Sequence, residues 1–186
     1  MNKAFFLDRD GTINVDHNFV HTPEEWTWCT GAVDAIRLLN DSGFKVIVVT
    51  NQSGISRGHF TIEQVQDLHG WVNKELEKAG AQIDDWYIAP YHPEFEPEND
   101  EYPEADRKPG TGMFNKAAQK HNIDFKKSYM AGDKITDLKP AVKLGMTPFF
   151  IKSRHQSTQD KDWLEEHHIS SYQTLQQALN DQFHYD

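Results

Sequence analysis

The feature that most restricts the fold of this chain is the stretch of residues 4–12, where a short apolar run stops abruptly at an acid. The run is typical of a buried strand, and Asp8 and Asp10 follow it, with a turn permitted by Gly11. In open α/β sheets, ligands bind at the carboxyl edge of the strands, which is where this pattern places both acids. Two carboxylates this close together repel each other, so the pair favours either a cation between them or a proton on one of them. Oxygen-only ligands suit Mg²⁺, which also bridges well to phosphate.

Two later apolar runs end in small polar groups in the same way. Residues 44–49 lead into Thr50 and a turn containing glycine, where a hydroxyl and backbone N–H groups can hold a phosphoryl oxygen. Residues 128–131 lead into a third acid, Asp133. Taken alone, each of these segments is also compatible with a solvated polar turn.

Two cations follow the least regular stretch of the chain. Residues 90–106 combine four prolines with seven acids, which is typical of a solvated loop, and Arg107 and Lys108 come directly after them. The two cations could pair with the preceding acids, or one of them could neutralise charge on a phosphate. An oxygen-rich pocket with one hydroxyl and one lysine fits Mg²⁺-assisted phosphoryl transfer. The expected set is Asp8, Asp10, Thr50, Lys108 and Asp133.

Apolar runs and amphipathic segments alternate along the chain, which predicts a doubly wound parallel α/β sheet in a single domain over residues 1–186. Thr61 and Gln64 form a capping box before one helix, and Pro148 indicates that the last strand starts at a sheet edge. Loops are expected at 13–21 and 153–160. The predicted strands are 4–7, 44–49, 83–89, 128–131 and 147–151. The predicted helices are 31–40, 61–78, 112–121, 136–144, 163–168 and 172–179.

Charge and composition exclude several classes of function. The formal net charge of -10 argues against a general nucleic-acid or anionic-membrane binder, because both need a basic face. The single cysteine, Cys29, permits neither an internal disulfide nor a cysteine-based metal site. No apolar stretch is long enough for a membrane span, and no charged-then-apolar leader precedes the first strand. We therefore expect a cytoplasmic protein, and we expect it to be a monomer.

Four motifs resemble, in order, those of the haloacid-dehalogenase-like phosphatases: Leu-Asp-Arg-Asp-Gly-Thr, Val-Val-Thr-Asn-Gln-Ser-Gly, Arg-Lys-Pro and Ala-Gly-Asp-Lys. The resemblance covers nearly the whole chain and thins after Ile151. Within this superfamily the chain most resembles the heptose bisphosphate phosphatases, and the histidinol-phosphate phosphatases are similar. The resemblance implies a Rossmann-like fold with a minimal cap, because no large insertion follows Thr12.

The resemblance also implies a role for each motif residue. Asp8 would attack phosphorus and form an aspartyl-phosphate, and Asp10 would protonate the leaving oxygen and then deprotonate the hydrolytic water. Mg²⁺ would lie between the Asp8 side chain, the Asp10 backbone carbonyl and Asp133. Thr50 and Lys108 would hold the transferring phosphoryl group. The expected substrate-binding residues are Asp16, His17, Asn18, Phe19, Asn51, Gln52, Ser53, Arg107 and Lys134.

One departure from the resemblance concerns zinc. Heptose bisphosphate phosphatases often carry a zinc loop, patterned Cys-x-His-x and later Cys-x-Cys, just before Arg-Lys. The matching positions here are Ala89, Tyr91 or His92, Glu104 and Asp106. No thiol is left, and structural zinc prefers nitrogen and sulfur ligands. We therefore expect no zinc site, and we expect prolines and packing to hold the 90–106 loop.

The leading hypothesis is a Mg²⁺-dependent phosphatase that removes the C7 phosphate of D-glycero-D-manno-heptose 1,7-bisphosphate in the formation of lipopolysaccharide-core heptose precursors. A phosphatase for histidinol phosphate or another small phosphomonoester is the first alternative. A 3′-phosphatase for nucleic-acid ends would share the chemistry, but the net charge of -10 disfavours it. A non-catalytic binding relative is disfavoured because Asp8, Asp10, Lys108 and Asp133 are all present. We expect a small sugar phosphate as the partner, and neither nucleic acid nor membrane.

Overall fold

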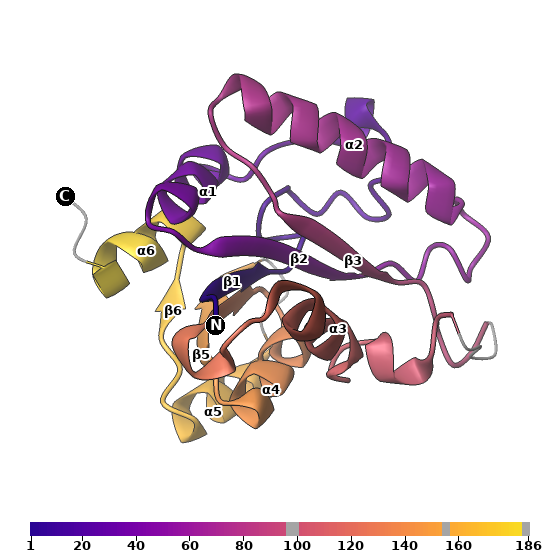
Figure 1. The fold of residues 1–186 in the computed structure, drawn as a ribbon. Coiled ribbons are helices and arrows are strands. Elements are labelled where there is room, and N and C mark those ends of the chain that lie inside the picture. Colours follow the sequence, from indigo (N-terminus) through magenta and orange to yellow (C-terminus); the bar gives the residue numbers. More distant parts are fainter. Residues whose placement is uncertain (96–100, 154–156, 184–186) are drawn as a thin grey trace.

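The computed structural model describes residues 1–95, 101–153 and 157–183. Within them, parallel strands form one six-stranded sheet in the order β3-β2-β1-β4-β5-β6, and helices cover both of its faces (Figure 1). The strands are β1 (Ala4–Leu7), β2 (Lys45–Asn51), β3 (Asp85–Ala89), β4 (Tyr129–Gly132), β5 (Thr147–Ile151) and β6 (Ser171–Tyr172). The α-helices are α1 (Ala32–Asp41), α2 (Ile62–Lys78), α3 (Gly112–His121), α4 (Ile135–Leu144), α5 (Thr158–Glu166) and α6 (Leu175–Phe183). Short 3-10 helices are η1 (Pro23–Glu25), η2 (Glu104–Asp106) and η3 (Phe125–Lys127).

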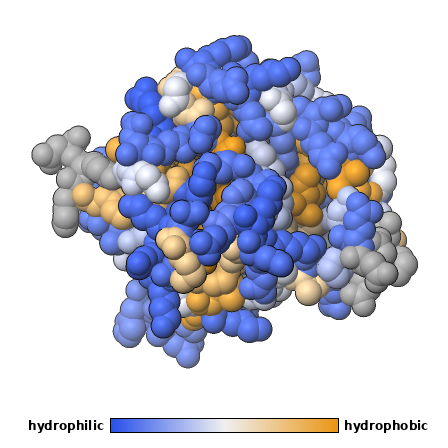
Figure 2. Space-filling model, viewed as in Figure 1, coloured by the Kyte–Doolittle hydropathy of each residue, from blue (hydrophilic) through white to orange (hydrophobic). Residues whose placement is uncertain are grey.

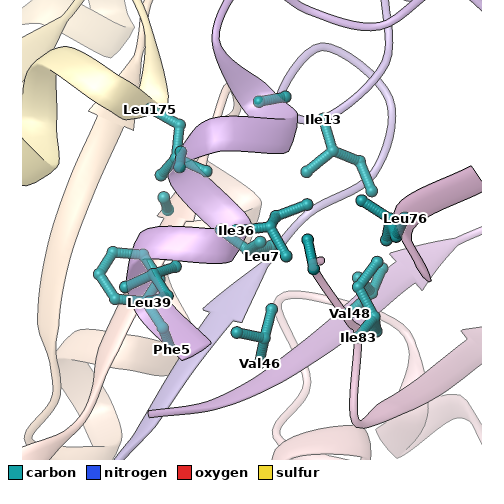
Figure 3. Close-up of a cluster of buried hydrophobic side chains, with 14 of the residues drawn as sticks. Phe5, Leu7, Ile13, Ile36, Leu39, Val46, Val48, Leu76, Ile83 and Leu175 are labelled. Atoms are coloured by element: carbon teal, nitrogen blue, oxygen red, sulfur yellow. The ribbon is translucent and has the colours of Figure 1, made fainter. Parts of the chain in front are cut away.

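Hydrophilic side chains dominate the face of the molecule in Figure 2, and many of the apolar ones are buried in two cores, one on each face of the sheet. Phe5 and Leu7 point into the first core, which α1, α2 and α6 close (Figure 3). Ala4 and Phe6 alternate with them and point into the second core, which α3, α4 and α5 close. All four residues of β1 are fully buried, so the end of this central strand is screened from water on both faces.

The register of the central strands brings their carboxyl ends level. Leu7 of β1 pairs with Val48 of β2 and with Ala131 of β4. The N–H of Asp8 continues this ladder by donating to the Ala131 carbonyl oxygen at 3.0 Å. The residues that follow these three strands therefore meet at one edge of the sheet, where doubly wound folds bind ligands.

The predicted doubly wound parallel fold is confirmed, and the boundaries of its first four helices and first five strands differ from the prediction by at most two residues. The capping box of α2 is present as predicted. The Gln64 N–H donates to Thr61 Oγ1 at 3.3 Å, and the Thr61 N–H donates to Gln64 Oε1 at 2.9 Å. This helix start was predictable because both partners lie in the four residues that define it.

The prediction for the start of α5 is wrong. The helix begins at Thr158, inside the expected 153–160 loop, because Ser157 and Asp160 form a capping box. The Asp160 N–H donates to Ser157 Oγ at 3.1 Å, and the Ser157 N–H donates to Asp160 Oδ2 at 2.7 Å. Residues 154–156 of that expected loop lie outside the described residues.

The prediction for the segment after α5 is also wrong. Ser171 and Tyr172 form a sixth strand, which pairs with Phe150 and Ile151 of β5. The expected helix at 172–179 consequently begins only at Leu175. Two residues are too few to show a period in the sequence, so tertiary pairing alone reveals this strand.

Within the described residues, Pro148 has a neighbouring strand on only one side of β5. It pairs with Met130 of β4, whereas β6 reaches only as far as Phe150. The N–H groups of Phe150 and Lys152 point toward β6, donating to the carbonyl oxygens of Ser170 and Tyr172. The backbone nitrogens of every second residue in a strand point to the same side, so the nitrogen of Pro148 also points to the side of β6. Strand β6 does not extend that far, and the predicted edge position of Pro148 is confirmed.

Candidate active site

Lys108 joins the ends of two strands to α4. Its Nζ donates to Oδ1 of Asp8 at 2.7 Å and to the Val49 carbonyl oxygen at 2.8 Å, and it lies 2.7 Å from Oδ1 of Asp137. These contacts use all three N–H donors of the ammonium group. Burial alone would lower the pKa of Lys108, but the carboxylates of Asp137 and Asp8 raise it, so the lysine stays charged.

Three buried carboxylates lie together here, and two of them, Asp8 and Asp137, pair with this lysine. Oxygens of Asp8, Asp133 and Asp137 all lie within 4.8 Å of one another. Burial, reinforced by the charges of Asp8 and Asp137, raises the pKa of Asp133 to about 8. Burial and the charge of Asp137 raise the pKa of Asp8 to about 6, although Lys108 opposes the shift. The group therefore carries more negative charge than the lysine balances.

The same group fits a magnesium ion. Both carboxylate oxygens of Asp133 are buried and lack a hydrogen-bond partner within the described part of the chain. Gly11 has φ +84°, and a Cβ there would collide with the Asp133 carboxylate, so the turn after β1 lies directly against this acid. Unpaired carboxylate oxygens with excess negative charge are the ligands that Mg²⁺ prefers. Asp8 and Asp133 are thus brought together as predicted for a metal site.

Asp10, the third expected metal ligand through its backbone carbonyl, directs its side chain into a separate network. Its Oδ1 accepts from Arg9 Nη2 at 2.8 Å and Asn14 Nδ2 at 2.9 Å, and its Oδ2 accepts from Gln52 Nε2 at 2.9 Å. Gln52 Nε2 also donates to Thr50 Oγ1 at 2.9 Å. Burial would raise the pKa of Asp10, but the Arg9 charge and these hydrogen bonds hold it below its usual value. Asp10 is therefore ionised and oriented from three sides.

The expected substrate-binding residues gather beside these acids, with one exception. A cavity of about 190 Å³ is lined by Asp16, Asn18, Phe19, Asn51, Gln52, Ser53 and Lys134, together with Asp10 and Gly54. A second cavity of about 180 Å³ brings Arg107 to the same place as Asp8 and Lys108. His17 lines neither cavity, and its Nε2 lies 3.2 Å from Thr27 Oγ1.

Sequence reasoning missed three residues of the site: Arg9, Asn14 and Asp137. Asp137 follows Asp133 by four residues in a segment predicted to become helical, and that spacing could have suggested that both acids share one face. Arg9 and Asn14 lie in an irregular turn, where no periodicity indicates the direction of a side chain. Gln52 lines the cavity, as expected for a substrate-binding residue, and its amide also joins Asp10 to Thr50, a contact that the sequence did not indicate.

The positions matched to a zinc loop make other contacts. The N–H of Glu94 donates to Nδ1 of His92 at 3.2 Å, and Asp106 is buried and paired with Lys116. Among the residues that the structure describes, only Asp8, Asp133 and Asp137 form a group of three or more side chains placed to hold a metal. Residues 96–100 of the expected loop lie outside the described ranges, and the lack of zinc stays a prediction.

A parallel sheet that carries an acid, a lysine and two further acids at the carboxyl edge of its central strands defines the class of haloacid-dehalogenase-like phosphatases. A solved structure of a D,D-heptose 1,7-bisphosphate phosphatase from B. bronchiseptica, complexed with magnesium and phosphate, is similar to this chain. The TM-score is 0.78 at 28% identity, over 96% of this chain and 99% of that one.

Curated relatives define the family more closely. The D-glycero-beta-D-manno-heptose-1,7-bisphosphate 7-phosphatase of Escherichia coli (strain K12) is 38% identical over 96% of this chain and 94% of the relative. The relative of the same name from Yersinia pestis is 46% identical over 75% of this chain and 74% of the relative. The family model for polynucleotide kinase 3 phosphatase matches residues 3–174. The chain therefore belongs to the polynucleotide kinase 3 phosphatase family, together with these heptose bisphosphate phosphatases.

Proposed function

We propose that this chain is a Mg²⁺-dependent phosphatase that hydrolyses the C7 phosphate of D-glycero-D-manno-heptose 1,7-bisphosphate, in the formation of lipopolysaccharide-core heptose precursors. The observation that carries the proposal is the contact between Asp8 and Lys108 at the end of β1, with Asp10 oriented beside it, in a chain so similar to phosphatases of that name. A carboxylate with one oxygen held by a lysine is an oriented nucleophile.

The reaction proceeds in two steps. Asp10 takes up a proton as the anionic phosphate arrives beside it. A carboxylate oxygen of Asp8 then forms a bond to phosphorus, the bond from phosphorus to the C7 oxygen breaks, and Asp10 gives its proton to that oxygen. Water then attacks the aspartyl-phosphate, Asp10 takes a proton from the water, and the bond between phosphorus and Asp8 breaks. The products are the sugar alcohol group and inorganic phosphate, and both carboxylates return to their starting state.

Charge on the transferring phosphoryl group is balanced by several side chains. Lys108 exchanges its contact with Asp8 for a phosphoryl oxygen, the Thr50 hydroxyl holds another, and Asp137 keeps Lys108 in place. The residues that would hold Mg²⁺ are the side chains of Asp8 and Asp133 and the backbone carbonyl of Asp10. A bound Mg²⁺ supplies further positive charge at the phosphoryl oxygens.

Substrate recognition falls to the residues around the first cavity. Asp16, Asn18, Asn51 and Ser53 offer polar groups suited to sugar hydroxyls, and Phe19 offers an apolar ring face, 43% exposed. Arg107 and Lys134 add positive charge for a second phosphate. A cavity of about 190 Å³ suits a small phosphomonoester.

We further propose a cytoplasmic monomer. No helix in the described ranges combines the length and the apolar composition that crossing a membrane requires. Size-exclusion chromatography coupled to light scattering tests the monomer directly, and a mass of twice 21.5 kDa or more would contradict it.

A 3′-phosphatase for nucleic-acid ends is the second candidate, because the description of the matching family model names that activity. The formal net charge of -10 opposes it, since binding to a nucleic-acid strand depends on neutralising its phosphates.

The decisive experiment measures phosphate release with Mg²⁺ from both anomers of heptose 1,7-bisphosphate, from histidinol phosphate and from a 3′-phosphorylated oligonucleotide. We expect a clear preference for one heptose anomer. A preference for histidinol phosphate or for the oligonucleotide would change the assigned substrate and leave Asp8 as the nucleophile.

The variant Asp8→Asn tests the nucleophile. It should abolish turnover of every substrate, and a wild-type-like rate would contradict the assignment of Asp8. The exposed Asp34 provides the matched control, Asp34→Asn, for which no change is expected.

A further inference from the structure

Arg9 is the largest side chain, by residue volume, among the described residues that are fully buried. Among the described residues, Asp10 is the one acid within ion-pair distance of it, with Nη2 at 2.8 Å and Nε at 3.2 Å from Asp10 Oδ1. On its other side, Nη1 lies 3.5 Å from Nε2 of His69, a ring stacked 3.9 Å from Trp86. A cation removed this fully from water is costly unless it is paired, so Arg9 and Asp10 form one unit.

The hydrogen bonds distinguish the two oxygens of Asp10. Oδ1 accepts from two nitrogens of Arg9 and from Asn14 Nδ2 at 2.9 Å, which occupies its lone pairs. Within the described ranges, Oδ2 accepts a hydrogen bond only from Gln52, at 2.9 Å. Asp10 lines both cavities, and Arg9 lines neither. Oδ2 is therefore the oxygen with room to meet a reacting group.

The same guanidinium reaches the loop that carries substrate-binding side chains. Arg9 Nη2 donates to the carbonyl oxygen of Val20 at 2.6 Å, and Val20 is fully buried. Asp16, Asn18 and Phe19 precede Val20 and line the cavity beside Asp10. One buried side chain thus connects Asp10 to the wall of the cavity.

We propose that Arg9 is a positioning residue for the reaction, which orients Asp10 so that Oδ2 exchanges the proton and holds the loop before Val20 against the same carboxylate. The inference rests on the proposed function, in which Asp10 protonates the oxygen that leaves phosphorus. As the bond from phosphorus to that oxygen breaks, Oδ2 passes the proton that it took up on substrate binding to the departing alkoxide, which leaves Asp10 ionised and paired with Arg9.

The test compares leaving groups. An alkoxide needs a proton in order to leave, whereas 4-nitrophenolate leaves without one. We expect Arg9→Met to lower kcat/KM roughly a hundredfold for an alkyl phosphate and by no more than about threefold for 4-nitrophenyl phosphate. The alkyl substrate is whichever one the wild type hydrolyses fastest, so a wrong sugar in the proposed function leaves this comparison intact. The exposed Arg37 provides the control, Arg37→Met, which should change neither value.

Two further variants separate positioning from general damage. Because Arg9 acts through Asp10, the combined Arg9→Met and Asp10→Asn variant should be no slower with the alkyl phosphate than Asp10→Asn alone. Arg9→Lys keeps the buried charge without the planar fork, and it should show the same selectivity with a smaller loss. Equal losses for both leaving groups, in either Arg9 variant, or multiplying losses in the combined variant would overturn the proposal.

Discussion

Lys108 forms ion pairs with two of the acids in the site. Its ammonium contacts Asp8 and Asp137, while Asp133 has no hydrogen-bond partner in the described part of the chain. Burial is the main cause of the raised pKa values, about 6 for Asp8 and about 8 for Asp133, and the charges of neighbouring acids add to both shifts. A divalent cation bound there would favour the ionised form of both acids and lower both pKa values.

Magnesium should therefore stabilise the protein, and more so at higher pH. The folded-state pKa of Asp133, about 8, lies above the usual aspartate value of 3.8. Its contribution to the stability of the metal-free protein is therefore full below pH 3.8 and is lost as the pH rises through 8. Because Mg²⁺ must displace that proton, its affinity should increase between pH 6 and about pH 8. At a free concentration about 100 times its Kd, Mg²⁺ adds about 2.7 kcal/mol to the free energy of unfolding.

Thermal unfolding with and without Mg²⁺, at pH 6 and pH 8.5, checks this prediction. For a chain of this size, the expected rise in Tm at the higher pH is roughly 5–10 °C. Asp133→Asn is the matched control, because it removes both the titrating group and a ligand, and its Tm should respond little to Mg²⁺ at either pH. An equal rise in Tm at both pH values would contradict the role given to Asp133.

For single residues, the sequence indicated which side chains lie at the ends of strands, but it did not indicate the direction of side chains in turns. Asp8, Thr50 and Asp133 could be placed together because the carboxyl ends of parallel strands align. Arg9 could not be placed because a turn has no periodicity that indicates the direction of a side chain, and only the fold shows that this side chain is fully buried. The direction of Gln52 was equally hidden, since it depends on where Asp10 and Thr50 lie in space.

Among the elements, the link from η2 to α3 controls the position of the two cations. A Cβ at Gly110 would lie 2.7 Å from the Arg107 carbonyl oxygen, so the chain folds tightly back on itself. At Gly112, the first residue of α3, a Cβ would lie 2.7 Å from the Ala105 carbonyl oxygen and would collide with Asp106. The link leaves no room for a side chain at either glycine.

Gly112→Ala should therefore damage both stability and activity. Backbone on one side and a buried, paired carboxylate on the other cannot move away cheaply, so we expect a loss of about 1–3 kcal/mol in the free energy of unfolding. A displaced Lys108 should lower kcat/KM by roughly tenfold to a hundredfold. Urea unfolding and steady-state kinetics measure the two effects.

Gly70 offers the matched control on α2. A Cβ there meets no atom within 4 Å, so Gly70→Ala should raise the free energy of unfolding by about 0.5–1 kcal/mol and leave kinetics unchanged. If Gly112→Ala behaved like Gly70→Ala, the tight link would not be what places the cations.

Elements were predictable where a local pattern was long enough to read. The box at Thr61 preceded a long amphipathic run, whereas the same pattern at Ser157 precedes five residues without an apolar side chain. Its helix packs Leu164 into the second core, which no local rule indicates. Strand β6 forms through its pairing with β5, which a local sequence pattern does not show.

For the whole molecule, we propose that residues 1–186 form one domain. Both cores rest on the same central strand, since Phe5 faces one and Phe6 faces the other. We expect unfolding in urea to give coincident transitions by circular dichroism and by tryptophan fluorescence. Trp26 lies in the first core and Trp163 packs against the second, so separate transitions would expose two independent units.

Purified protein should contain no stoichiometric zinc. Ala89 offers no ligand at the first matched position, and Asp106 is already paired with Lys116. Elemental analysis after purification without added metal measures this directly, and incubation with a chelator should leave the Tm of the Mg²⁺-free protein unchanged. One zinc per chain would show that the loop before Arg107 binds metal with a ligand set that differs from the familiar pattern.

The side of β5 at Pro148 that β6 does not cover affects how readily the protein aggregates in concentrated solution. An unpaired strand edge invites the strand of another molecule to add to the sheet, which begins aggregation. At that flank Pro148 has no N–H to offer, and β6 covers the strand from Phe150 onward. At this position a single imino acid thus lacks the N–H that a strand of another molecule would need for pairing with β5.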